Sequence, residues 1–145
     1  MMLGVGVEDE VRAANAAFYS AFESGDLDAM AEVWDRSDHA RVTHPGWPTL
    51  YGWAKVIASW EAIFTNTEFI QFVLTEEHIL VLDQVAVVTL DENILQTAGS
   101  PDGGAADTGE LSGARVAATN LFAHDGTGWR MVHHHGSPVS GDVAV

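Results

Sequence analysis

The sequence predicts a single α+β domain in which helices cover one face of a mainly C-terminal antiparallel sheet, in the order α-α-β-α-β-β-β-β. Apolar residues recur at helical spacing in the first third of the chain, and the pattern changes to long strands from Phe69 onward. The chain has 145 residues, of which 47% are hydrophobic. That is enough for one domain with a substantial core.

Three segments have helical periodicity. The first, 8–24, begins with acidic residues at the positive end of the helix and ends at Gly25. Asp26 is placed to cap the second helix, 27–34. The third, 53–64, follows Gly52, and its predicted buried side carries Val56, Ile57, Trp60, Ile63 and Phe64.

The predicted strands are separated by turn signals. A short strand, 40–44, is stopped by the Pro-Gly-Trp-Pro run 45–48, and the segment 99–109 reads as a loop rich in Gly, Asp and Ala. A turn at 83–84 and a hairpin turn at 125–128 join neighbouring strands. The four long strands are predicted over 69–83, 85–97, 111–124 and 129–136.

Composition excludes several classes of function. The net charge of −15 disfavours binding to nucleic acid or anionic lipid, which needs basic patches. No apolar run is long enough to span a membrane, and we expect no signal peptide. The chain has no cysteine, which is consistent with a cytoplasmic location.

The last strand carries three consecutive histidines. Simple alternation places Met131, His133, His135 and Ser137 on one face and His134 on the other. Two imidazoles on one inward face indicate a cavity with chemistry in it. The alternative is that His133 and His135 are structural and fill the interior through hydrogen bonds. His134 is expected to face outward, where a dimer interface is one option.

Four local patterns, taken in order, resemble the nuclear transport factor 2-like superfamily and its SnoaL-like branch over residues 8–138. They are Gly25-Asp26-Leu27-Asp28, His44-Pro45-Gly46, Gly52 with Ile57 and Trp60, and Trp129 followed by residues 132–137. The resemblance implies one domain over 8–138 between tails 1–7 and 139–145. It implies a cone-shaped curved sheet (a cystatin-like α+β barrel) and a homodimer that forms through the outer sheet face.

The final strand is also similar to the association domain of calmodulin-dependent kinase II, where two histidines flank one residue. An arginine usually follows the second histidine there, and Gly136 stands at that place here. Anion binding by that arginine is therefore not carried over.

His44 directly precedes a proline after the first strand, where ketosteroid isomerases of this superfamily carry their general base. A histidine titrates near neutral pH, so His44, with His133 and His135, is the predicted catalytic set. The isomerase oxyanion-hole positions look like Phe18 and Asn120, and phenylalanine donates no hydrogen bond. If Tyr19 points inward instead, that objection to isomerase chemistry weakens.

The predicted ligand-binding residues are mostly aromatic: Phe18, Tyr19, Trp47, Tyr51, Trp60 and Asn120. Trp47 either walls the pocket mouth or fixes its loop to the third helix. Arg115 either pairs with a carboxylate or, if it lies in the cavity, implies an anionic ligand.

A more specific alternative is a metal site. His44, His133 and His135 would supply three nitrogens and Asp38 or Glu61 a carboxylate, although His-x-His spacing is weakly specific. We predict no cofactor and no metal, and the expected partner is a small apolar or partly polar molecule. The predicted function is small-molecule binding, with isomerase, dehydratase (lyase) or cyclase chemistry as the enzymatic form. The rival is a non-catalytic ligand-sensing or assembly module.

Overall fold

The computed structural model describes residues 6–97 and 111–140. The predicted loop over 99–109, residues 1–5 of the N-terminal tail and residues 141–145 of the C-terminal tail lie outside them. Within the described ranges no helix is long and apolar enough to cross a membrane. The elements are α1 (Val7–Ser24), α2 (Leu27–Val33), β1 (Arg41–Thr43), β2 (Leu50–Tyr51), α3 (Trp53–Asn66), β3 (Ile70–Leu82), β4 (Val85–Thr97), β5 (Leu111–His124) and β6 (Trp129–Pro138).

The six strands form one sheet in the order β2-β1-β6-β5-β4-β3. The sheet is curved but open, since β2 and β3 are its two edges, so the predicted barrel does not close. It is also not wholly antiparallel, because β1 runs parallel to β6. The strand β2 was not predicted, because two residues are too short to display an alternating pattern.

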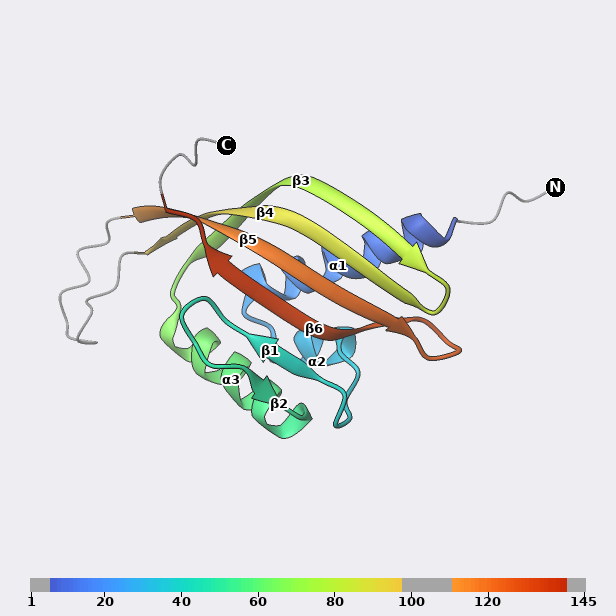
Figure 1. The fold of residues 1–145 in the computed structure, drawn as a ribbon. Coiled ribbons are helices and arrows are strands. Elements are labelled where there is room, and N and C mark those ends of the chain that lie inside the picture. Colours follow the sequence, from blue (N-terminus) through green and yellow to red (C-terminus); the bar gives the residue numbers. More distant parts are fainter. Residues whose placement is uncertain (1–5, 98–110, 141–145) are drawn as a thin grey trace.

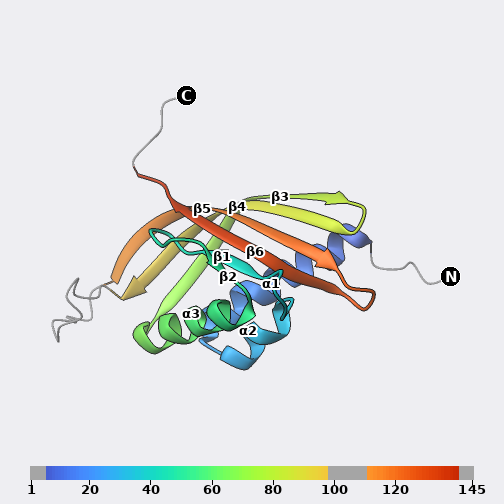
Figure 2. The same ribbon diagram turned by 60° about the horizontal axis from the view of Figure 1, so that its bottom comes forward.

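Within residues 6–97 and 111–140, the three helices lie on one face of the sheet and the opposite face carries none (Figures 1 and 2). The layer between them is rich in aromatic rings. Phe18 contacts Trp60 and Phe22 edge to face, with ring centroids 5.5 and 6.0 Å apart. Phe22 in turn contacts Phe72 of β3 at 4.7 Å. This cluster joins α1, α3 and the sheet into one core.

The predicted helix ends have the expected geometry. Gly25 takes a left-handed backbone conformation (φ 62°), in which its N–H reaches the last carbonyls of α1. The side chain of Asp26 accepts a hydrogen bond from the N–H of Ala29 at 3.0 Å and so caps α2. These two residues set the sharp turn between the first two helices.

A β-bulge in β6 reverses the predicted orientation of the three histidines. Phe122 pairs with Met131 and Leu121 pairs with His133, so Val132 is an extra residue on β6. Beyond the bulge the alternation shifts by one position. His134 is therefore buried on the inner face, and the prediction that His133 and His135 face inward is wrong.

A second bulge lies in β3, between the pairs Thr75–Asp91 and His78–Thr89. Glu76 at this bulge has a positive φ of 55°, which is uncommon for a residue with a side chain. The bulge bends β3 over α1 and brings Glu77 to the inner side, within hydrogen-bond reach of that helix.

Candidate functional site

A cavity of about 480 Å³ lies between the concave side of the sheet and α3. Its walls are largely apolar, and three buried titratable side chains line it: His44, Glu92 and His134. These residues come from three places in the chain: the turn after β1, the middle of β4, and β6 beyond its bulge. The apolar lining includes Phe22, Trp47, Ile63, Ile70, Ile94 and Val116.

His44 is held in one tautomer by α3. Its Nε2 atom lies 2.9 Å from Oγ of Ser59, and that hydroxyl donates its hydrogen to the carbonyl of Val56 at 2.6 Å. Because a serine hydroxyl has one hydrogen, Nε2 of His44 must be the donor to Ser59. The Nδ1 atom then carries the lone pair. Burial lowers the pKa of His44 to about 4, so the ring is neutral at pH 7.

His134 is fixed in the opposite tautomer by Asn120. Its Nδ1 atom lies 2.6 Å from Oδ1 of Asn120. The amide nitrogen of Asn120 donates to Asn15 at 2.8 Å and to the hydroxyl of Tyr19 at 3.2 Å. An amide oxygen only accepts, so Nδ1 of His134 is the donor and Nε2 carries the lone pair. Burial holds the pKa of His134 well below its ordinary range.

Glu92 is the third buried group. The hydroxyl of Tyr19 accepts from Asn120 and therefore donates its own hydrogen to Oε2 of Glu92, at 2.6 Å. Burial raises the pKa of Glu92 to about 7, and the bond from Tyr19 only partly opposes this. Glu92 thus exchanges a proton near neutral pH, which is the property expected of a general acid or base.

The two other histidines of the run lie on the outer face of the sheet. His133 and His135 have ring centroids 5.9 Å apart and border a shallow hollow with Ala117, Thr119, Leu121 and Ser137. Arg41 pairs in register with His133 from β1. The sheet therefore separates them from His44, and the three nitrogens of the alternative metal site do not converge. No group of three or more candidate metal-binding side chains occurs among residues 6–97 and 111–140.

The predicted ligand-binding residues divide into three groups. Trp47 lines the cavity, is 42% exposed, and contacts the ring of His44 at 4.9 Å. Phe18, Tyr19, Trp60 and Asn120 are buried behind the cavity wall, where Trp60 packs against His44 at 4.7 Å. Tyr51 is 59% exposed and lies under the guanidinium of Arg41 at 5.2 Å.

The structure also shows where Arg115 lies and what surrounds Gly136, which stands where the kinase association domain usually has an arginine. Arg115 borders the cavity but is exposed, and its neighbour Val116 takes the inward position on β5. Gly136 is buried, and a Cβ atom there would lie 3.0 Å from Cγ of Pro45 and 3.1 Å from Val116. The contact leaves no room for the arginine that is usual in the kinase association domain.

Sequence reasoning missed Glu92 and assigned His134 to the wrong face. Glu92 did leave a signal, because it follows Ala86, Val88 and Leu90 in the same alternating position of a strand that is apolar on that side. A carboxylate in such a row is unusual. His134 left none, because its orientation depends on the bulge.

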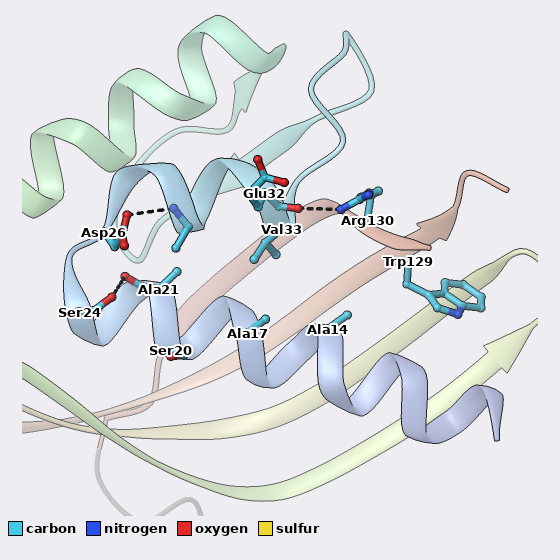
Figure 3. A pocket seen from close by; sticks show the side chains of 11 residues that line it. Ala14, Ala17, Ser20, Ala21, Ser24, Asp26, Glu32, Val33, Trp129 and Arg130 are labelled. Atoms are coloured by element: carbon cyan, nitrogen blue, oxygen red, sulfur yellow. Dashed lines mark hydrogen bonds between the residues drawn. The ribbon is translucent and has the colours of Figure 1, made fainter. Parts of the chain in front are cut away.

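A second hollow, of about 550 Å³, lies between α1 and α2 and is open to solvent (Figure 3). Small side chains of α1, including Ala14, Ala17 and Ser20, form its floor. Arg130 spans its rim and donates to the carbonyl of Glu32 at 2.8 Å. None of its lining residues is a buried titratable group, so the chemistry of the described part of the chain is concentrated in the first cavity.

Comparison with known proteins agrees with this fold. A family model described as the SnoaL-like domain matches residues 11–141. A solved structure from Streptomyces avermitilis, described as a "putative dehydratase from the NTF2-like family", is 40% identical, with 92% of this chain and 96% of that chain covered and a TM-score of 0.80. A "putative calcium/calmodulin-dependent protein kinase type II association domain" from Thiobacillus denitrificans is 32% identical, with 89% and 94% covered and a TM-score of 0.73.

More distant matches extend the comparison. The F-box protein SKIP8 of Arabidopsis thaliana is 27% identical over 123 residues, which are 85% of this chain and 47% of that protein. The chain thus spans about half the length of this curated relative. A ketosteroid isomerase-like structure from Erwinia carotovora and a cystatin-like one from Caulobacter vibrioides, 20% and 16% identical with TM-scores of 0.72 and 0.77, share the fold.

Proposed function

Because the chain belongs to the SnoaL-like family of nuclear transport factor 2-like proteins, we propose that its cavity binds a small organic molecule and catalyses cofactor-independent acid–base chemistry on it. The reaction class is isomerisation, dehydration or cyclisation. The observation that carries this proposal is the convergence of His44, Glu92 and His134 on one apolar cavity. The likeness to a protein described as a dehydratase supports the same class.

The three groups have complementary roles in such a reaction. A neutral His44 takes a proton from carbon next to a carbonyl, and the electron pair left behind forms a carbon–carbon double bond. In a dehydration, the adjacent carbon–oxygen bond breaks, and protonated Glu92 supplies the hydrogen with which hydroxide leaves as water. Proton transfer from His44 back to Glu92 then restores the site. His134, which lines the cavity in place of the predicted His133 and His135, orients the substrate.

The test is turnover of a panel of β-hydroxy ketones, followed by the ultraviolet absorption of the conjugated product. The proposal expects Glu92→Gln and His44→Gln each to lower kcat by about 10²–10⁴-fold, as for the loss of a general acid or base. Glu61→Gln and His78→Gln are matched controls on exposed positions. Full turnover by both cavity variants would refute the acid–base proposal.

The second candidate is an assembly or ligand-sensing module without catalysis. The likeness to a kinase association domain at 32% identity favours it. In that case the buried polar groups serve stability alone. The cavity variants would then lower the melting temperature and the oligomeric mass without affecting any turnover.

The outer sheet face supports a homodimer as the form of the protein. It exposes large apolar side chains, including Val73, Leu80 and Leu95. It also carries Arg41 and Arg115, two of the six basic residues of a chain whose net charge is −15. Two copies that meet here bury this apolar surface.

A further inference from the structure

Building on the proposed function, we propose that the ligand of the cavity is an uncharged molecule that donates hydroxyl hydrogens, and that carboxylates and phosphates are rejected. This names a substrate class for the site. It follows from the direction of each hydrogen bond in the buried network, from the charges around the cavity and from its apolar walls.

The hydrogen bonds of His44 and His134 leave acceptor atoms available to the ligand. Ser59 uses the Nε2 hydrogen of His44, and Asn120 uses the Nδ1 hydrogen of His134. Each neutral ring therefore keeps one nitrogen with a lone pair and no hydrogen. Some polar atoms of the described residues are fully enclosed and have no hydrogen-bond partner. These two ring nitrogens are not among them. Both rings line the cavity, with centroids 6.4 Å apart, so one small ligand can reach both.

The tautomer of His134 is fixed by more than its bond to Asn120. Asn120 cannot turn its amide to offer a hydrogen to His134 without losing its bonds to Asn15 and Tyr19. Asn15 is held in turn by its bond to Glu77 at 3.1 Å. A ligand that needs a hydrogen from His134 would have to reverse this whole chain. A ligand that brings its own hydrogens leaves it intact.

Charge excludes anions from the same space. Glu92 is the buried carboxyl in the wall, and its proton is the one exchangeable hydrogen that the three titratable groups offer a ligand. The cationic residue in the lining, Arg115, has an exposed side chain on the outer parity of β5, since Val116 takes the inward position. An anion in the cavity would lie against a carboxyl and two lone pairs, and the described residues offer no buried cation to offset the loss of water.

The apolar walls define the rest of the ligand. Phe22, Ile63, Ile70, Ile94 and Val116 leave much of the cavity surface without polar atoms. A volume of about 480 Å³ lies in the range of ordinary small-molecule sites. The ligand is therefore a carbon skeleton with hydroxyl groups at the end that meets His44 and His134.

Three probes with one skeleton separate the alternatives: 1-indanol, 1-indanone and indane-1-carboxylate. Binding is measured by calorimetry on the full chain at pH 8.5, where Glu92 is ionised. We expect the alcohol to bind at least 10-fold more tightly than the ketone, which donates nothing, and the carboxylate to bind weakest. On acidification to pH 6, protonated Glu92 becomes a donor and the ketone gains affinity. In the Glu92→Gln variant, the affinity for the ketone should no longer depend on pH.

A second measurement needs no ligand. Nitrogen-15 NMR of the imidazoles, assigned with His44→Gln and His134→Gln, reports which nitrogen of each ring carries hydrogen. Hydrogen on Nε2 of His44 and on Nδ1 of His134 supports the proposal, and the opposite tautomer at either ring overturns it. Carboxylate binding equal to or tighter than alcohol binding also overturns it. Both readouts are independent of turnover, so a failed acid–base test and a failed ligand class are distinguishable.

Discussion

Replacement of Glu92 by glutamine tests the burial of this carboxyl through the pH dependence of stability. Glutamine has nearly the same shape, and its amide oxygen can still accept the hydrogen bond from Tyr19. The change removes the titration and little else. The quantity of interest is the difference in unfolding free energy between the wild-type protein and Glu92→Gln at each pH.

The magnitude follows from the two pKa values. The pKa of Glu92 is about 7 in the folded protein, against 4.5 for an ordinary glutamate. Because one pKa unit corresponds to about 1.4 kcal/mol, the difference is worth about 3 kcal/mol. The folded state binds the proton more tightly, so this stabilisation is fully present below pH 4.5 and is lost as the pH rises through 7.

The wild-type curve alone would hide this effect. The pKa of His44 is lowered to about 4 from 6.5, so its contribution to stability rises with pH across nearly the same window. Subtraction of the Glu92→Gln curve removes the histidine contribution, which is common to both proteins. What remains should fall by about 3 kcal/mol between pH 4.5 and 8.

Urea unfolding followed by tryptophan fluorescence at half-unit pH steps gives the required free energies. Glu61→Gln on the exposed side of α3 is the control, and its difference from wild type should stay within about 0.5 kcal/mol, as is usual for surface substitutions. A Glu92→Gln difference that is flat between pH 5 and 8 would refute the assignment of a buried, protonated carboxyl to the cavity.

Three other outcomes are expected. Ser59→Ala should lower the unfolding free energy by about 1–3 kcal/mol in urea titrations, because the buried Nε2 hydrogen of His44 loses its acceptor; an unchanged midpoint would contradict that bond. Gly136→Ala should lower the unfolding free energy by about 1–3 kcal/mol in the same assay, since the new Cβ lies 3.0 Å from Pro45. A stabilised protein would show that the turn after β1 can shift without cost. Leu80→Glu on the outer face should reduce the mass found by light scattering from twice the chain mass to 15.6 kDa, and an unchanged dimer would place the interface elsewhere.

The sequence predicted best those elements whose pattern is local. The bounds of β4 and β5 match the expected 85–97 and 111–124, because each strand alternates over its buried half without interruption. The helix ends at Gly25 and Asp26 were likewise encoded within a few residues. These signals need no knowledge of the partner strand or helix.

The inner face of α1 was harder to predict. Asn15, Phe18 and Tyr19 are all buried, because α1 lies in the concave side of the sheet and is covered over a wide arc. A choice between Phe18 and Tyr19 for the inward position was therefore unnecessary. The condition set for Tyr19 is met, since its hydroxyl joins the buried network, and the objection to isomerase chemistry weakens accordingly.

The faces of the three consecutive histidines of β6 were beyond local reasoning. A bulge is a property of two strands, and nothing within Trp129–Pro138 marks Val132 as the residue without a partner. His44 lines the cavity, and it was singled out because it precedes a proline where the similar ketosteroid isomerases carry their general base. Its ordinary pKa was a poor guide, however, since burial is set by Trp60 and the helix above it.

The extra residue at Val132 also bears on how related chains are to be compared. In an ungapped alignment, a homologue without the bulge would match its inward histidine to His133 or His135, although those two side chains here face away from the cavity. The residue equivalent to His134 is the one that pairs with the position of Asn120 on the neighbouring strand. A residue role carried from one homologue to another along this strand should therefore follow strand pairing rather than column number.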